Sequence, residues 1–174
     1  LADSTATRDD IIRAYGISTD SLDVLKRFNA DGTCSVVQVN YSLLNRAPEG
    51  EFLSYCQEHK IAVMVRGPLS RGLLAGKYDL DSEFTDDVRE SWNKGGSRRD
   101  EYEAKIAQVE KLKERFEPGN EMVTAAIRYV ISHPADPVAI PGAKSPKQAA
   151  MNAAAGDKLF SADELSDLRA LMDS

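Results

Sequence analysis

Residues 35–65, SVVQVNYSLLNRAPEGEFLSYCQEHKIAVMV, contain the pattern that decides the fold. The stretch begins with Ser35–Val39 and ends with Ile61–Val65, and both runs are almost continuously apolar and rich in β-branched residues. Such runs predict strands that are covered on both faces. Between them, Phe52 and Cys56 recur at helical spacing. A buried strand, a helix and another buried strand predict a parallel sheet with a right-handed crossover.

The same alternation extends in both directions from this stretch. Upstream, a short apolar run at 11–17 ends at residues 18–20, which are three candidate helix caps. The sequence predicts these further elements: a helix around Leu22, Leu25 and Phe28, helices at 102–116 and 122–130, a strand at 137–140, a helix that Ser145 and Pro146 begin, and a last helix that Ser161 and Glu164 begin with a capping box. The fold class is therefore α/β, with four parallel strand–helix units in one domain over residues 1–174. Since a parallel barrel of eight such units takes about 250 residues, we expect half of one here.

Two segments depart from this regular pattern. Residues 69–100 hold several glycines and charges but little sustained periodicity, which predicts either a functional loop or a disordered one. Trp92 lies inside this segment, where it could line a substrate pocket or anchor the loop. Residues 1–10, LADSTATRDD, are polar and rich in Ser and Thr, and we expect an irregular N-terminal segment there.

Composition and charge limit the possible partners. The chain is 42% hydrophobic and 29% charged, which is typical of a soluble globular protein. A net charge of −6 argues against a nucleic-acid surface, and the longest apolar runs fall short of the ~20 residues of a membrane span. Cys34 and Cys56 have no CxxC spacing, so we expect buried free thiols in a reducing compartment. The sequence thus predicts a cytoplasmic protein that binds neither nucleic acid nor membrane.

Four segments, in this order, resemble the aldo-keto reductases. They are IRAYGIST (12–19), VQVNYSLLNR (37–46), VRGPLSRGLLAGKY (65–78) and AIPGAKSPKQAAMN (139–152). Their order and spacing are those of the second half of that family. The resemblance implies the C-terminal half of a (β/α)8 TIM barrel of aldo-keto reductase type. It also implies binding of NADP(H) in an extended form and reduction of aldehydes or ketones to alcohols.

The resemblance implies cofactor contacts at the ends of the first three strands. Ser18 and Gln38 match residues that hydrogen-bond the nicotinamide carboxamide, and Thr19 stands where the family often has asparagine. Arg66 stands where many members carry an aromatic ring against the nicotinamide, and a planar guanidinium can also stack. Gln38 could instead be a buried polar strand residue, and Arg66 a surface arginine.

Two loops complete the implied cofactor site. The first loop lays backbone N–H groups against the pyrophosphate, and its glycines permit the backbone to approach the phosphates closely. It consists of Gly67, Pro68, Leu69, Ser70, Arg71 and Gly72. The other is a small-residue turn that runs into a capped helix, whose free N–H groups favour an anion. It contributes Gly142 and Ala143 in the turn, Lys144, Ser145, Lys147 and Gln148 at the adenosine 2′-phosphate, and Asn152 at the adenine. The family more often has arginine where Gln148 stands. The two lysines favour NADP over NAD, although a plain tight turn and a solvated helix start would explain both loops without a ligand.

The catalytic tyrosine, lysine, aspartate and histidine of the family all precede the part that this sequence matches. We therefore assign no catalytic residue. His59 and His133 match no catalytic position and are expected to be surface or capping groups, while Tyr15 and Tyr41 are expected to pack or to line the pocket. A reaction by proton and hydride transfer needs a proton donor, so this chain alone is expected to be inactive.

Three arrangements would complete the barrel. A separate N-terminal half could add the missing strands, two copies could close on each other, or the chain could be a piece of a longer enzyme, which we favour. A small carbonyl compound is the expected substrate of the completed barrel. The alternative function is a non-enzymatic, reductase-like half-barrel that acts through assembly with a partner chain, with the charged 69–100 segment as its contact surface. A different barrel enzyme that shares only the phosphate site is a weaker third possibility.

Overall fold

A computed structural model describes residues 12–174, and it contains one parallel sheet of four strands in the order β1-β2-β3-β4. The strands are β1 (Gly16–Ser18), β2 (Val36–Asn40), β3 (Ala62–Arg66) and β4 (Val138–Ala139). β2 and β3 pair over five residues, and the N–H of Ile140 donates to the carbonyl of Val65 at 3.0 Å just beyond β4. Neighbours in sequence are thus neighbours in the sheet, and the parallel α/β fold is confirmed.

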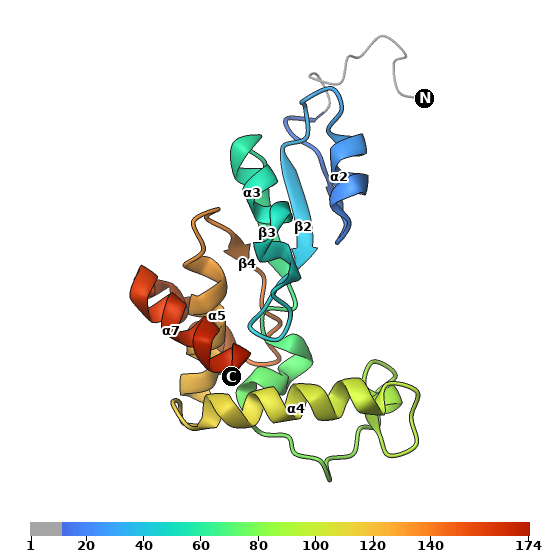
Figure 1. The fold of residues 1–174 in the computed structure, drawn as a ribbon, viewed down its shortest axis with the longest axis vertical. Coiled ribbons are helices and arrows are strands. Elements are labelled where there is room, and N and C mark those ends of the chain that lie inside the picture. Colours follow the sequence, from blue (N-terminus) through green and yellow to red (C-terminus); the bar gives the residue numbers. More distant parts are fainter. Residues whose placement is uncertain (1–11) are drawn as a thin grey trace.

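Helices connect the strands and follow the last one. They are α2 (Leu22–Phe28), α3 (Glu51–Glu58), α4 (Arg99–Lys113), α5 (Asn120–Ile131), α6 (Pro146–Ala154) and α7 (Ala162–Asp173). Four 3-10 helices lie between them: η1 (Ala47–Glu49), η2 (Ser70–Ala75), η3 (Glu90–Trp92) and η4 (Ala155–Asp157). Figure 1 shows β2, β3 and their helices in the upper part of the molecule, with α4 across the lower end. None of the helices in residues 12–174 is long and apolar enough to cross a membrane.

The core lies on one face of the sheet. Val37 and Val39 of β2 and Val63 and Val65 of β3 are buried, together with residues of the covering helices. The alternate residues of β2, among them Gln38, are only half-buried. The expectation that these strands are covered on both faces is therefore wrong for the described part of the chain, because helices cover one face and no described element covers the other.

Three helix starts test the predicted caps. The side chain of Ser21 caps α2 by accepting from the N–H of Val24, so the cap predicted at residues 18–20 is wrong by one residue. Ser145 caps α6, with Pro146 in the first turn, as predicted. The capping box at the start of α7 is confirmed, because the side chains of Ser161 and Glu164 each accept a backbone N–H of the other.

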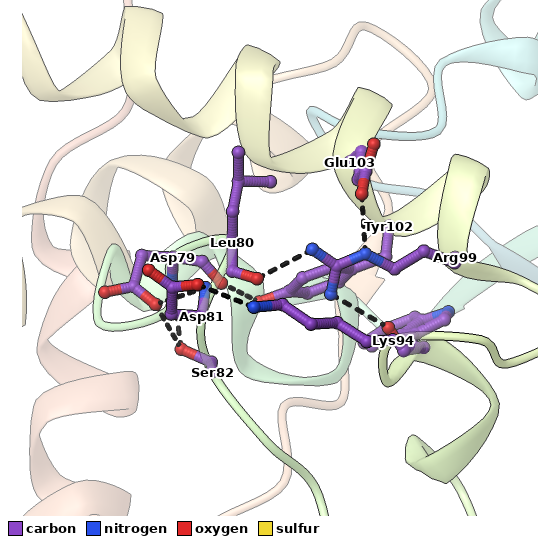
Figure 2. Close-up of polar contacts among 9 residues, drawn as sticks. Asp79, Leu80, Asp81, Ser82, Lys94, Arg99, Tyr102 and Glu103 are labelled. Atoms are coloured by element: carbon purple, nitrogen blue, oxygen red, sulfur yellow. Dashed lines mark hydrogen bonds and ion pairs between the residues drawn. The ribbon is translucent and has the colours of Figure 1, made fainter.

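The 69–100 segment is packed onto α4. It contains η2, η3 and the buried Phe84, and Figure 2 shows how two residues of α4 hold its backbone. The hydroxyl of Tyr102 donates to the carbonyl of Asp79 at 2.6 Å, and Arg99 donates to that of Leu80 at 2.6 Å. Trp92 is only 1% exposed and stacks on Tyr102, so it anchors the segment. The predicted irregular segment at 1–10 lies outside the described residues.

Candidate cofactor-binding site

The parallel pairing of β1 and β2 brings Ser18 and Gln38 together at the carboxyl edge of the sheet. The two residues are register partners, and the Ser18 Oγ lies 3.4 Å from the Gln38 Oε1. Thr19 continues the pairing by donating its N–H to the carbonyl of Gln38 at 3.0 Å. Its Oγ1 accepts from the N–H of Ser21 at 3.1 Å, so this hydroxyl helps to shape the turn into α2.

Arg66 is the last residue of β3, and its guanidinium forms an ion pair with Asp20. The other carboxylate oxygen of Asp20 accepts from the backbone N–H of Asn40 at 2.8 Å. Asp20 therefore joins the ends of three neighbouring strands. The sequence predicts Asp20 only as a candidate helix cap, because nothing in its local sequence points to an arginine 46 positions away.

The loop from Gly67 to Gly72 is bent sharply. Gly67 has φ +68°, and a Cβ there would lie 2.8 Å from the side-chain oxygen of Asn40, so this position favours glycine. Ser70 and Arg71 also have positive φ, which is uncommon for residues with a side chain. The N–H groups of Ser70 and Gly72 donate to carbonyls within the loop, and Pro68 has no N–H. In this conformation the loop offers fewer donors to a pyrophosphate than the sequence predicts.

Three side chains of this loop contact the rest of the protein. Pro68 is buried and Leu69 packs against the core, so both can contribute only their backbone to a ligand. Arg71 donates to the carbonyl of Val88 at 2.9 Å, and its guanidinium lies 5.4 Å from the ring centre of Trp92. Arg71 thus ties the loop to the packed 86–92 segment.

The start of α6 gathers the residues predicted at the 2′-phosphate. The Ser145 side chain accepts from the N–H of Gln148 at 3.2 Å, and the Gln148 side chain accepts from the N–H of Lys144 at 2.7 Å. Asn152 reaches back to the carbonyl of Gly142 at 3.4 Å. Lys144 and Lys147 are exposed at this helix start, and neither belongs to an ion pair among the described residues.

The two loops leave the same edge of the sheet, because β3 and β4 are parallel neighbours. Helix α5 packs against both η2, which includes residues 70–72, and α6. A Cβ built on Gly142 would meet nothing within 4 Å, so the turn before α6 is open. This arrangement can accept an extended anionic ligand that runs from the strand ends to α6. Ala143, in the same turn, is exposed.

The tyrosines and histidines in this part of the molecule have structural roles. Burial raises the pKa of Tyr41, whose hydroxyl donates to Glu49 at 2.7 Å. Tyr15 packs edge-on against Phe28. Burial lowers the pKa of His133, whose Nδ1 accepts from the N–H of Ala135 at 3.1 Å, and His59 caps the end of α3. These contacts make His59 a capping group, and the expectation that neither histidine is catalytic stays a prediction.

The two cysteines are free and buried, as predicted. Burial raises the pKa of Cys56 to about 12, so its thiol is not ionised at neutral pH. Residues 12–174 contain no group of histidine, cysteine or acidic side chains that could hold a metal ion.

Comparison with known proteins now identifies the family. The sequence profile of the aldo/keto reductase family matches residues 8–173. The chain belongs to that family. It is 34% identical over 140 residues to the aldo-keto reductase YhdN of Bacillus subtilis, a match that covers 79% of this chain and 42% of the relative. Over 70 residues it is 37% identical to the NADH-specific methylglyoxal reductase of Escherichia coli, a match that covers 40% of this chain and 22% of that protein.

Solved structures of aldo-keto reductases superpose on almost the whole chain. The glycerol dehydrogenase of Gluconobacter oxydans matches with a TM-score of 0.72 and 28% identity over 94% of this chain and 50% of that one. An aldo/keto reductase of Klebsiella pneumoniae, solved in complex with NADP and acetate, matches with a TM-score of 0.60 and 27% identity over the same shares. The fold is therefore a partial (β/α)8 barrel, and the chain spans about half the length of the relatives it matches. NADP is bound in structures of its relatives.

Proposed function

We propose that this chain supplies the cofactor-binding half of an NADP(H)-dependent oxidoreductase that reduces aldehydes and ketones to alcohols. The observation that carries the proposal is the arrangement of the sheet edge, where the strand ends and both glycine-containing loops open onto one surface. The superposition on a family member that holds NADP supports it.

The residues of this chain fit the cofactor chemically. Gly67 turns away from the strand at a point where a larger residue would meet Asn40, and the space around Gly142 is open. Lys144 and Lys147 place two positive charges beside the N-terminus of α6, which suits a phosphate. Ser18 and Gln38 present a hydroxyl and an amide at neighbouring strand ends, which suits a carboxamide.

Each group then has a defined task. Ser18 and Gln38 would orient the nicotinamide ring, with Thr19 shaping the adjacent turn, and the planar guanidinium of Arg66 would be available to stack on the ring. The 67–72 loop would contact the pyrophosphate through its backbone, while the start of α6 would bind the 2′-phosphate and Asn152 would bind the adenine. The bound cofactor supplies the hydride.

The proton donor and the rest of the barrel are proposed to lie outside this chain. Burial raises the pKa of Tyr41, and it raises the pKa of Tyr129 to about 12. Both hydroxyls are therefore too weakly acidic to serve as the proton donor at neutral pH. The missing N-terminal half, or a second copy, would complete the barrel and enclose a small carbonyl substrate. The sheet edges support the proposal that further strands complete the barrel, because the outer strands β1 and β4 each have one edge without a partner strand within the described residues. Two buried free thiols are consistent with the reducing cytoplasm.

Cofactor preference tests the proposal most directly, because one relative is named as NADH-specific. We expect K144A/K147A in the full-length protein to weaken NADPH binding by about 30-fold, since each lysine contributes roughly 1 kcal/mol to phosphate binding. NADH has no 2′-phosphate, so its affinity should change less than about threefold. Fluorescence of the bound nicotinamide measures both affinities.

The matched control is K111A/K158A, which removes the same charge from α4 and the end of η4. It should leave both affinities unchanged. Equal weakening of NADPH and NADH by K144A/K147A, or no weakening of either, would contradict the assigned phosphate site. Binding of NADPH without reduction of any aldehyde in the full-length protein would favour the alternative role as an assembly module.

A further inference from the structure

Asp20 holds a bridge across the carboxyl edge of the sheet. It lies two residues beyond β1, and one carboxylate oxygen accepts the N–H of Asn40, the last residue of β2, at 2.8 Å. The other oxygen pairs with the guanidinium of Arg66, the last residue of β3. A single carboxylate therefore ties the ends of three adjacent strands together.

The backbone on both sides keeps this bridge in place. Thr19 is held by its N–H bond to Gln38, and Ser21 caps α2, so the turn that carries Asp20 is fixed before and after it. On the other side, the left-handed turn at Gly67 ends β3 immediately after Arg66. The guanidinium is thus positioned by a carboxylate whose own place does not depend on the ion pair.

The bridge also determines the local charge. A hollow beside Asp20 is lined by Leu22, Asn45, Ala47, Pro48, Glu51 and Phe52, together with Asp20 and Asn40. This lining contains two carboxylates and no basic side chain. The guanidinium of Arg66 lies outside this lining and is already paired with Asp20, so a substrate carboxylate that approaches the strand ends would find its positive charge already balanced.

We propose that Asp20 is a positioning residue that also determines specificity. It holds the Arg66 guanidinium beside the nicotinamide and neutralises its charge, so that the site prefers uncharged aldehydes and ketones to carbonyl compounds that carry a carboxylate. This inference rests on the proposed function, because it requires the nicotinamide and the substrate to lie at the Arg66 end of β3.

The variant D20N in the full-length protein tests it. Asparagine keeps an oxygen for the N–H of Asn40 but removes the charge that pairs with Arg66. We expect the ratio of kcat/KM for 4-carboxybenzaldehyde to that for 4-nitrobenzaldehyde to rise about fivefold, the effect of freeing one partly exposed charge. D23N is the matched control, since Asp23 lies in the exposed first turn of α2 and D23N makes the same change in net charge. It should leave the ratio unchanged.

A second measurement needs neither cofactor nor turnover. Nitrogen-15 NMR of arginine side chains reports rotation of each guanidinium, which should be slow for Arg66 in the wild type and in D23N, and fast in D20N. Fast rotation of Arg66 in the wild type, or an aldehyde ratio that D20N leaves unchanged, would overturn the inference. Slow wild-type rotation in a protein that neither binds NADPH nor reduces either aldehyde would instead defeat the proposed function.

Discussion

At the scale of single residues, the turn after β3 shows how closely the backbone constrains the sequence. Gly67 has φ +68°, a conformation that costs a residue with a Cβ about 1 kcal/mol. A Cβ there would also lie 2.8 Å from the side-chain oxygen of Asn40, so that side chain would have to move. The glycine is therefore needed both for the turn and for the approach of two strand ends.

We expect G67A to lower the free energy of unfolding by about 1–2 kcal/mol, because alanine is strained at positive φ and displaces the Asn40 side chain. Urea unfolding of the wild type and the variant measures the difference. G156A is the control, since Gly156 has no positive φ and no atom within 4 Å of a built Cβ. A loss in G67A no larger than that in G156A would show that the turn relaxes without strain.

At the scale of one element, α4 is stabilised along its exposed side by a group of charges. Glu101 accepts from Arg98 at 2.7 Å and from Lys105, four residues further along the helix, at 2.5 Å. The Arg98 hydrogen bond contributes most to lowering the pKa of Glu101, to about 2. Since the Glu101 side chain is 38% exposed, solvent screens much of this interaction.

The low pKa of Glu101 makes this contribution depend on pH. A carboxyl whose folded pKa of about 2 lies below its ordinary value of 4.5 adds stability above pH 4.5 and loses it as the pH falls towards 2. E101Q should therefore unfold about 0.5–1 kcal/mol more easily at pH 7, with a smaller difference at pH 3. Urea titrations at both pH values check this. A difference that is equal at the two pH values, or that E114Q reproduces, would rule out the ion pairs as its cause.

At the scale of the whole molecule, the C-terminal helix is tied back to the loop after β2. Glu49 of η1 accepts from the hydroxyls of Tyr41 and Tyr129, and from Arg169 of α7 at 3.0 Å. Arg46 forms a second ion pair with α7, at Asp173. The two ion pairs join residues 120 and 127 positions apart, so α7 is part of the same packed unit as the sheet.

Removal of the Glu49 carboxylate should weaken this connection strongly. E49A leaves two buried tyrosine hydroxyls and a partly buried arginine without their acceptor, which we expect to cost about 2–4 kcal/mol. E58A, at the exposed end of α3, should change stability by less than about 0.5 kcal/mol. Thermal and urea unfolding measure both variants, and hydrogen exchange in α7 should rise in E49A. Unchanged protection of α7 would show that packing alone holds the helix.

Much of the fold could be predicted, because it is encoded in local patterns. The apolar runs located β2 and β3, and Ser145 with Pro146 located the start of α6, since strand periodicity and capping depend on residues close in sequence. One-sided burial of the sheet could not be predicted from a continuous apolar run, which looks the same whether or not the second face is covered. The Asp20–Arg66 and Glu49–Arg169 pairs also escaped prediction, because each joins residues from distant turns. Most candidate cofactor residues were found through a family resemblance, and their role stays a prediction.

The buried position of Trp92 has a practical consequence. It is the single tryptophan of the chain, so light absorbed at 295 nm excites one site within it. Arg71 links that indole to the loop proposed to contact the pyrophosphate, and the ring is shielded from water. Its emission should therefore be blue-shifted in the native state and move to longer wavelength on unfolding. A bound reduced dinucleotide would quench part of that emission by resonance energy transfer. The loss of Trp92 fluorescence would therefore report binding of the dinucleotide at the site.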